Sequence, residues 1–160
     1  MSILKLCKDA GMHTAIDTCG FVPWETMKRV LEYVDLVLYD LKQMDPMEHE
    51  KATGVSNSLI LDNARKICHE SRASLMIRIP IIPGFNDSIE NIKATATFVL
   101  QELNPSIPIH LLPYHRLGES KYEQMEVLRT PLGIEAPGEE HLQRLKTVLE
   151  SQGLIVTTGG

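Results

Sequence analysis

Short runs that suit buried β-strands alternate along this chain with longer runs that suit amphipathic helices. The clearest strand is DLVLYDLK (residues 35–42), which is apolar on both of its faces and therefore predicts a strand covered on both sides. Similar runs predict further strands over residues 13–18, 75–79 and 107–114, with a short last one over 154–157. Apolar residues at helical spacing predict helices over residues 3–10, 23–34, 59–67, 89–103 and 139–149.

This alternation predicts an α/β fold built from parallel βα units. About four such units fit into the 160 residues, which we expect to form a single domain. Four units are half of a (β/α)₈ barrel, for which about 250 residues are usual. An arc of four strands cannot close on itself, so we expect a partial barrel with an open edge. Pro80 and Pro83 cannot donate ladder hydrogen bonds, and the third strand is expected to leave the sheet there.

The composition argues against several classes of protein. A formal net charge of −5 argues against nucleic-acid binding, because neutralising phosphates needs a basic face. No apolar run approaches the roughly 20 residues of a membrane span. The three cysteines, Cys7, Cys19 and Cys68, are odd in number and far apart in sequence, which favours a reducing compartment and predicts a cytoplasmic protein. Their spacing also argues against a local zinc or iron–sulfur site, whose ligands cluster in sequence.

Polar side chains follow four successive predicted strands at the points where these strands end. These residues are Asp17 with Thr18, Asp40 with Lys42, Arg78, and His115. Chemistry in parallel α/β folds collects at the carboxyl ends of the strands, so we expect these side chains to converge on one ligand. Some of these residues have a structural interpretation as well. Asp40 and Lys42, two residues apart, could form a structural ion pair. Arg78 could hold a carboxylate of the ligand, but it could equally pair with Asp17.

Five motifs together resemble a known family. They are, in chain order, AIDTCGF (15–21), VLYDLKQMD (37–45), GVSN (54–57), RIPIIPGFND (78–87) and LLPYHRLGESKY (111–122). The series is similar to that of the activating enzymes of glycyl radical enzymes, which belong to the radical S-adenosylmethionine superfamily. Pyruvate formate-lyase activating enzyme is the best-known member. The resemblance runs over essentially the whole chain, up to the closing GLIVTTGG.

The resemblance implies a partial barrel of the radical S-adenosylmethionine type. In that family S-adenosylmethionine chelates one iron of a [4Fe–4S] cluster, and an electron from the cluster cleaves the sulfonium. The resulting deoxyadenosyl radical takes a hydrogen atom from a glycine of the partner enzyme. The implied partners are a glycyl radical enzyme as protein substrate and an electron donor such as flavodoxin or ferredoxin.

The resemblance also assigns roles to individual residues. Those expected around S-adenosylmethionine are Asp40 and Lys42 of the DxK motif, His115 of the LLPYH motif, and Arg78 at the barrel mouth, with Lys42 a natural partner for the ligand carboxylate. A second group resembles a monovalent-cation site beside the ligand, formed by Asp17, Thr18, the carbonyl of Leu38, and Asp40. Hard oxygen donors suit such an ion. No residue of this chain is assigned a catalytic role.

Two family elements are not found in this sequence, the CxxxCxxC loop that binds the cluster and the GGE strand that holds the S-adenosylmethionine amino group. Both belong upstream of Ser2 in the family's order. The chain is therefore predicted to be the C-terminal half of an activating enzyme and inactive by itself. The alternative is a non-catalytic half barrel that docks a partner through its open edge. An ordinary α/β enzyme that uses Asp40, Lys42 and His115 for acid, base or Schiff-base chemistry ranks last.

Overall fold

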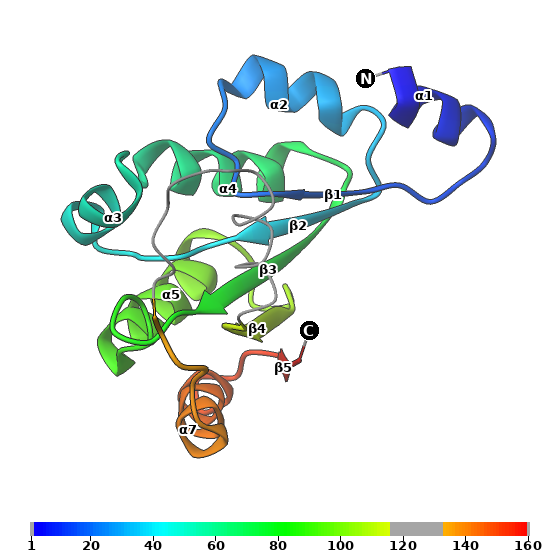
Figure 1. Ribbon diagram of the computed structural model, residues 1–160. Coiled ribbons are helices and arrows are strands. Elements are labelled where there is room, and N and C mark those ends of the chain that lie inside the picture. The colour runs from blue at the N-terminus through cyan, green and yellow to red at the C-terminus, as the bar shows by residue number, and fades with distance from the viewer. Residues whose placement is uncertain (1, 116–132, 160) are drawn as a thin grey trace.

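The computed structural model of the chain describes residues 2–115 and 133–159, in which strands and helices alternate as the sequence predicts (Figure 1). The strands are β1 (Ala15–Thr18), β2 (Leu36–Asp40), β3 (Ser74–Ile81), β4 (Ile109–Pro113) and β5 (Val156–Thr158). The helices are α1 (Ser2–Asp9), α2 (Trp24–Leu31), α3 (Pro46–Thr53), α4 (Ser58–Glu70), α5 (Ile89–Glu102) and α7 (Glu139–Glu150). The last seven residues of the fifth motif (116–122) lie outside the described part.

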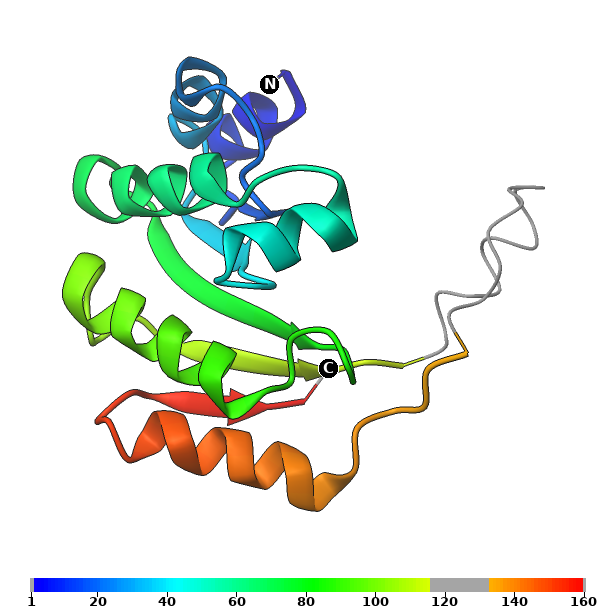
Figure 2. The ribbon, with the colours of Figure 1, turned by 90° about the vertical axis from the view of Figure 1, so that its left-hand side faces the viewer.

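The strands form a single sheet in which all neighbours are parallel. Their order in the sheet, β1-β2-β3-β4-β5, is also their order in the chain. Figure 1 shows α2, α4, α5 and α7 on the outer side of the curved sheet, and Figure 2 shows α4, α5 and α7 stacked along that side. The predicted fold, an open arc of parallel βα units, is confirmed. Within the described residues β1 and β5 each pair on one side only.

The two faces of the sheet are covered differently. Alternate strand residues point at the helices and are fully buried, among them Val37, Tyr39, Ile77, Ile79, Ile109 and Leu111. On the opposite face Leu38, Met76 and Leu112 are only half-buried. The expectation that residues 35–42 are covered on both sides is therefore wrong for one side. The apolar side chains there line the inner face of the arc, which no helix of residues 2–115 and 133–159 covers.

The third strand does not leave the sheet at Pro80; β3 continues to residue 81 and ends before Pro83. The nitrogen of Pro80 points toward β2, since the carbonyl of Arg78 accepts from that side. β2 has already ended there, because its last residue, Asp40, pairs with Arg78. The N–H that proline lacks therefore falls beyond the last residue pair of β2 and β3. The Pro80 carbonyl is satisfied by Nδ2 of Asn86 at 2.6 Å.

Helix α3 is not among the helices that the sequence predicts, although its ends carry clear signals. The Asp45 side chain accepts hydrogen bonds from the backbone N–H groups of Met47 and Glu48 at 2.8 and 3.0 Å, which caps the N-terminus. Gly54 ends the helix in the left-handed conformation, with φ 81°. The helix has no continuous apolar stripe, so hydrophobic spacing does not reveal it.

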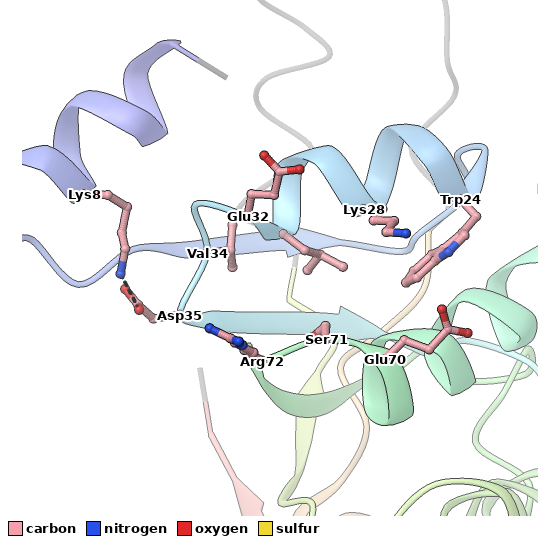
Figure 3. A pocket seen from close by; sticks show the side chains of 10 residues that line it. Lys8, Trp24, Lys28, Glu32, Val34, Asp35, Glu70, Ser71 and Arg72 are labelled. Carbon is pink, nitrogen blue, oxygen red and sulfur yellow. Dashed lines mark hydrogen bonds and ion pairs between the residues drawn. The ribbon is translucent and has the colours of Figure 1, made fainter.

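An ion pair ties α1 to the start of β2. Lys8 Nζ lies 2.6 Å from Asp35 Oδ1, and Asp35 Oδ2 accepts a hydrogen bond from the Thr14 backbone at 2.8 Å (Figure 3). The Lys8 hydrogen bond, followed by that of Thr14, lowers the pKa of Asp35 to about 2 from 3.8. The ion pair matters for the position of α1, because Ile3 and Leu6 are 77% and 67% exposed and so contribute little packing against the rest of the fold.

We predict that Asp35→Asn removes part of the acid sensitivity of folding. A carboxyl whose pKa is lowered by folding stabilises the native state above its unfolded pKa, and this contribution is lost as the pH falls toward 2. Urea midpoints of the wild type should therefore fall more steeply than those of the variant between pH 4 and pH 2. Asp9→Asn, which breaks the exposed Lys5–Asp9 pair, is the matched control. Parallel pH profiles of wild type and Asp35→Asn would contradict the prediction.

Candidate functional site

Three charged side chains come together on neighbouring strands, Asp17 and Asp40 near the carboxyl ends of β1 and β2 and Arg78 three residues before the end of β3. Arg78 on β3 donates from Nε and Nη2 to Asp40 Oδ1 on β2, at 3.1 and 3.0 Å. Nη2 also donates to Asp17 Oδ1 on β1 at 2.7 Å. The register explains the contact, because Asp40 and Arg78 pair directly across β2 and β3. The alternative that Arg78 pairs with Asp17 is thus what the structure contains, with Asp40 as a further partner.

Lys42 lies two residues beyond Asp40 and outside the strand. Its Nζ is 3.7 Å from Asp40 Oδ2, so the Asp–Lys pair expected from the sequence is present. The Lys42 carbonyl accepts hydrogen bonds from Nδ2 of Asn86 at 2.8 Å and of Asn91 at 3.3 Å. Asn86 and Asn91 are 0% and 5% exposed. Two buried amides therefore fix the backbone at Lys42, while the Lys42 side chain remains 31% exposed.

The charges of this group balance. Burial of Arg78 acts to lower its pKa, but the hydrogen bonds and charges of Asp40 and Asp17 outweigh burial, and the pKa is raised. Arg78 and Lys42 thus supply two positive charges against the two carboxylates. Such a balanced group suits the part of a ligand that carries both a carboxylate and an ammonium group, because these charges can pair with Lys42 and Asp40.

A cavity of about 310 Å³ lies beside Asp40 and Lys42, a volume at the lower end for small-molecule sites. Its other walls come from the segment after β1, from α3 and its C-terminal turn, and from α4, through Cys19, Phe21, His49, Thr53, Val55 and Ile60. Cys19 adjoins the strand end at Asp17 in the sequence, whereas no sequence pattern indicates the other wall residues. Phe21 reaches the cavity through the turn after β1, and the packing of α3 and α4 brings the other four there.

His49 is a titratable group of this wall that no sequence pattern indicates. Its Nδ1 lies 2.8 Å from the Val55 carbonyl, which can only accept, so Nδ1 carries the proton. The ring is 3% exposed and lines the cavity. In its neutral form His49 therefore keeps Nε2 as a hydrogen-bond acceptor.

The remaining predicted site residues do not join the cluster among the contacts of the described residues. Thr18 Oγ1 accepts a hydrogen bond from the Gly20 N–H at 2.9 Å and so closes the turn after β1. Leu38 pairs with Asp17 across β1 and β2. His115 is exposed two residues beyond β4 and is not among the described residues that line the cavity. The structure thus brings together Asp17, Asp40, Lys42 and Arg78 but not His115.

A larger cavity of about 510 Å³ lies at the opposite edge of the sheet, under α2 and beside the end of α4 (Figure 3). Its charged wall residues are Lys8, Lys28 and Arg72 against Glu32, Asp35 and Glu70. Three charges of each sign, of which Lys8 and Asp35 pair with one another, select no ligand by charge. This cavity also lies at the amino ends of the strands, away from the edge where parallel α/β folds place their chemistry. The candidate site is therefore the Asp40–Lys42 cavity.

Comparison with known proteins gives the family. The chain is 39% identical over 159 residues to the trans-4-hydroxy-L-proline dehydratase activating enzyme of Clostridioides difficile, which covers 99% of this chain and 52% of the relative. It is 37% identical over 153 residues to the isethionate sulfite-lyase activating enzyme of Oleidesulfovibrio alaskensis, covering 95% and 48%. A crystal structure of a domain of pyruvate formate-lyase-activating enzyme from Bacteroides vulgatus matches with a TM-score of 0.80 and 34% identity, over 99% of this chain and 88% of that one. The chain belongs to the glycyl-radical-enzyme activating enzymes.

This membership confirms the family inferred from the five motifs and makes the chain part of the radical S-adenosylmethionine superfamily. No family model matches the chain. The chain spans about half the length of the curated activating enzymes that it matches. No helix among the described residues is long and apolar enough to cross a membrane.

The residues of this activating-enzyme chain fit the two family cofactors differently. Asp40 and Lys42 offer a carboxylate and an ammonium group at a cavity with the apolar walls Phe21, Val55 and Ile60, which suits S-adenosylmethionine with its zwitterionic amino-acid part and its nucleoside. An iron–sulfur cluster does not fit. The free cysteines lie on α1, after β1 and on α4, and no three His, Cys, Asp or Glu side chains of the described residues are grouped to hold a metal ion.

Proposed function

We propose that this chain supplies the S-adenosylmethionine-positioning half of an activating enzyme that generates a glycyl radical on a partner enzyme. The observation that carries the proposal is the Asp40–Lys42 pair, held beside a cavity at the carboxyl edge of the sheet. S-adenosylmethionine, when bound, supplies the deoxyadenosyl group that takes hydrogen from the partner's glycine. The [4Fe–4S] cluster and its CxxxCxxC loop belong to a segment other than this chain.

The chain's own residues bind and orient the ligand. Lys42 Nζ offers a positive charge to the ligand carboxylate, and Asp40 Oδ2 accepts a hydrogen bond from a hydroxyl or amino group. Phe21, Val55 and Ile60 exclude water from the apolar part of the ligand. His115 belongs to the proposal as a further ligand contact.

A monovalent cation near Asp17, Thr18, Leu38 and Asp40 also stays part of the proposal. In the structure the two carboxylates already share the positive charge of Arg78, so an added cation would have to enter together with the ligand carboxylate to keep the site neutral. The partner is proposed to be a glycyl radical enzyme, and the reductant an electron donor such as flavodoxin or ferredoxin.

The test joins this chain to an upstream segment that carries a CxxxCxxC motif, taken from the 39% identical Clostridioides difficile relative. After anaerobic reconstitution the joined protein should show iron–sulfur absorbance and form 5′-deoxyadenosine from S-adenosylmethionine, whereas this chain alone should show neither. A joined protein with an intact cluster but no 5′-deoxyadenosine would overturn the proposal.

Within the joined protein, Lys42→Ala should weaken S-adenosylmethionine binding by about tenfold, because a charged hydrogen bond to the ligand is lost. The cluster absorbance should not change. Lys93→Ala, an exposed lysine on α5, is the matched control and should leave the affinity as it is. Equal affinities for Lys42→Ala and Lys93→Ala, measured by equilibrium dialysis, would remove Lys42 from the ligand site.

A further inference from the structure

The two oxygens of the Asp40 carboxylate have different partners. Oδ1 accepts both Arg78 hydrogen bonds, at 3.1 and 3.0 Å, whereas Oδ2 lies 3.7 Å from Lys42 Nζ. A carboxylate with one oxygen held by a guanidinium fork cannot rotate freely about its Cβ–Cγ bond. Oδ2 is therefore the oxygen that remains for a ligand.

Arg78 directs two of its three nitrogens, Nε and Nη2, at the two carboxylates. Its Nη2 binds Asp17 Oδ1 at 2.7 Å in addition to Asp40, and its side chain is 17% exposed, close to the 18% of Asp40. Because both side chains are largely buried, solvent and salt screen the Arg78–Asp40 contact little. Asp17, at 59% exposed, is the weaker anchor. Arg78 is also not among the described residues that line the Asp40–Lys42 cavity.

We propose that Arg78 is a positioning residue of the S-adenosylmethionine site, which acts through Asp40 and does not itself touch the ligand. It fixes Asp40 so that Oδ2 faces a hydroxyl or amino donor of the ligand, and it neutralises Asp40 so that Lys42 stays available to the ligand's anionic group. The inference rests on the proposed function and revises the expected contact between Arg78 and the ligand.

The charges predict the effect of removing Arg78. The two carboxylates then face Lys42 alone, and the freed Asp40 can turn toward the Lys42 ammonium group and hold it more tightly than at 3.7 Å. The ligand thereby loses both an oriented acceptor and an available cation. A lysine in place of Arg78 keeps the charge but not the planar fork, so it restores the affinity only in part.

The experiment is a double-mutant cycle on this chain, with S-adenosylmethionine as the probe and calorimetry as the measurement. Arg78→Met and Asp40→Asn should each weaken binding by about tenfold, and the double variant should bind no more weakly than Asp40→Asn within about twofold. Arg78→Lys should recover part of the loss. Arg65→Met, which breaks a surface pair with Glu102, is the control for the loss of an arginine and should not change the affinity.

A second measurement needs no ligand. The Nε–H resonance of Arg78 should exchange slowly with solvent in the wild type and in Asp17→Asn, and rapidly in Asp40→Asn, because Nε donates to Asp40 alone. Losses of affinity that multiply in the double variant would mean that Arg78 binds the ligand directly and would overturn the inference while leaving the proposed function intact. The absence of any S-adenosylmethionine affinity in the wild-type chain would overturn the inference as well. The proposed function itself is judged separately by 5′-deoxyadenosine formation in the joined protein.

Discussion

Gly20→Ala is expected to lower the free energy of unfolding by about 3 kcal/mol, through backbone strain and overpacking together. Gly20 adopts φ +71° in the turn after β1, and a Cβ there would overlap Oη, Cζ and Cε2 of Tyr39. Tyr39 cannot move away, because its ring is fully buried and its hydroxyl donates to the Ile60 carbonyl at 2.7 Å. The collision therefore has to be relieved by the backbone that leads from β1 to the cavity.

The melting temperature should fall by about 6–12 °C, as expected for a domain of this size. Gly11→Ala is the matched control. Gly11 has nearly the same φ of +74°, but an added Cβ would meet nothing within 4 Å, so only the conformational cost of about 1 kcal/mol applies. Calorimetric scans of the two variants separate backbone strain from the Tyr39 contact. Equal losses in the two variants would show that Tyr39 does not restrict this position.

The burial pattern explains why most of the fold is predictable from the sequence. Strand residues such as Ile77 and Ile79 alternate with half-buried neighbours, and the predicted helices carry apolar stripes. The local periodicity of apolar residues therefore predicts which segments form strands and which form helices. The strand-end rule likewise indicates Asp17 and Asp40, because parallel strands present their ends at one edge, whereas Arg78 lies within β3 and joins them because it pairs with Asp40.

Features that depend on contacts between distant segments are not predictable in this way. The course of β3 through Pro80 depends on where β2 ends, and hydrophobic spacing does not reveal α3, whose signals are its two caps. His49 reaches the cavity only through the packing of α3. Contacts made by residues of the five motifs are equally hidden in the sequence. Asn57 of GVSN donates to the backbone carbonyls of residues 43 and 44, and so supports the segment after β2 from more than ten residues away in sequence.

Asn86→Ala is expected to destabilise the fold by about 4 kcal/mol, because it removes the side-chain partner of the Pro80 carbonyl and of the Ile82 N–H and leaves the Lys42 carbonyl with Asn91 alone. The Asn86 side chain is fully buried. Its Nδ2 donates to the carbonyls of Lys42 at 2.8 Å and Pro80 at 2.6 Å, and its Oδ1 accepts from the Ile82 N–H at 2.8 Å. One amide thus joins the loop after β3 to the segment that carries Lys42.

The loss should appear in function as well as in stability. At a temperature where Asn86→Ala is still folded, the Lys42 backbone is no longer fixed and S-adenosylmethionine binding should weaken, since a displacement of about 1 Å at a binding group is costly. Asn104→Ala, which removes one exposed hydrogen bond to Ser106, should cost less than about 1 kcal/mol and leave binding unchanged. Urea unfolding and calorimetric titration of the two variants measure both effects. Full affinity in a destabilised Asn86→Ala would show that Lys42 is positioned by its own strand and by Asn91 rather than by Asn86, and the role of the β3–α5 loop in the site would then be structural alone.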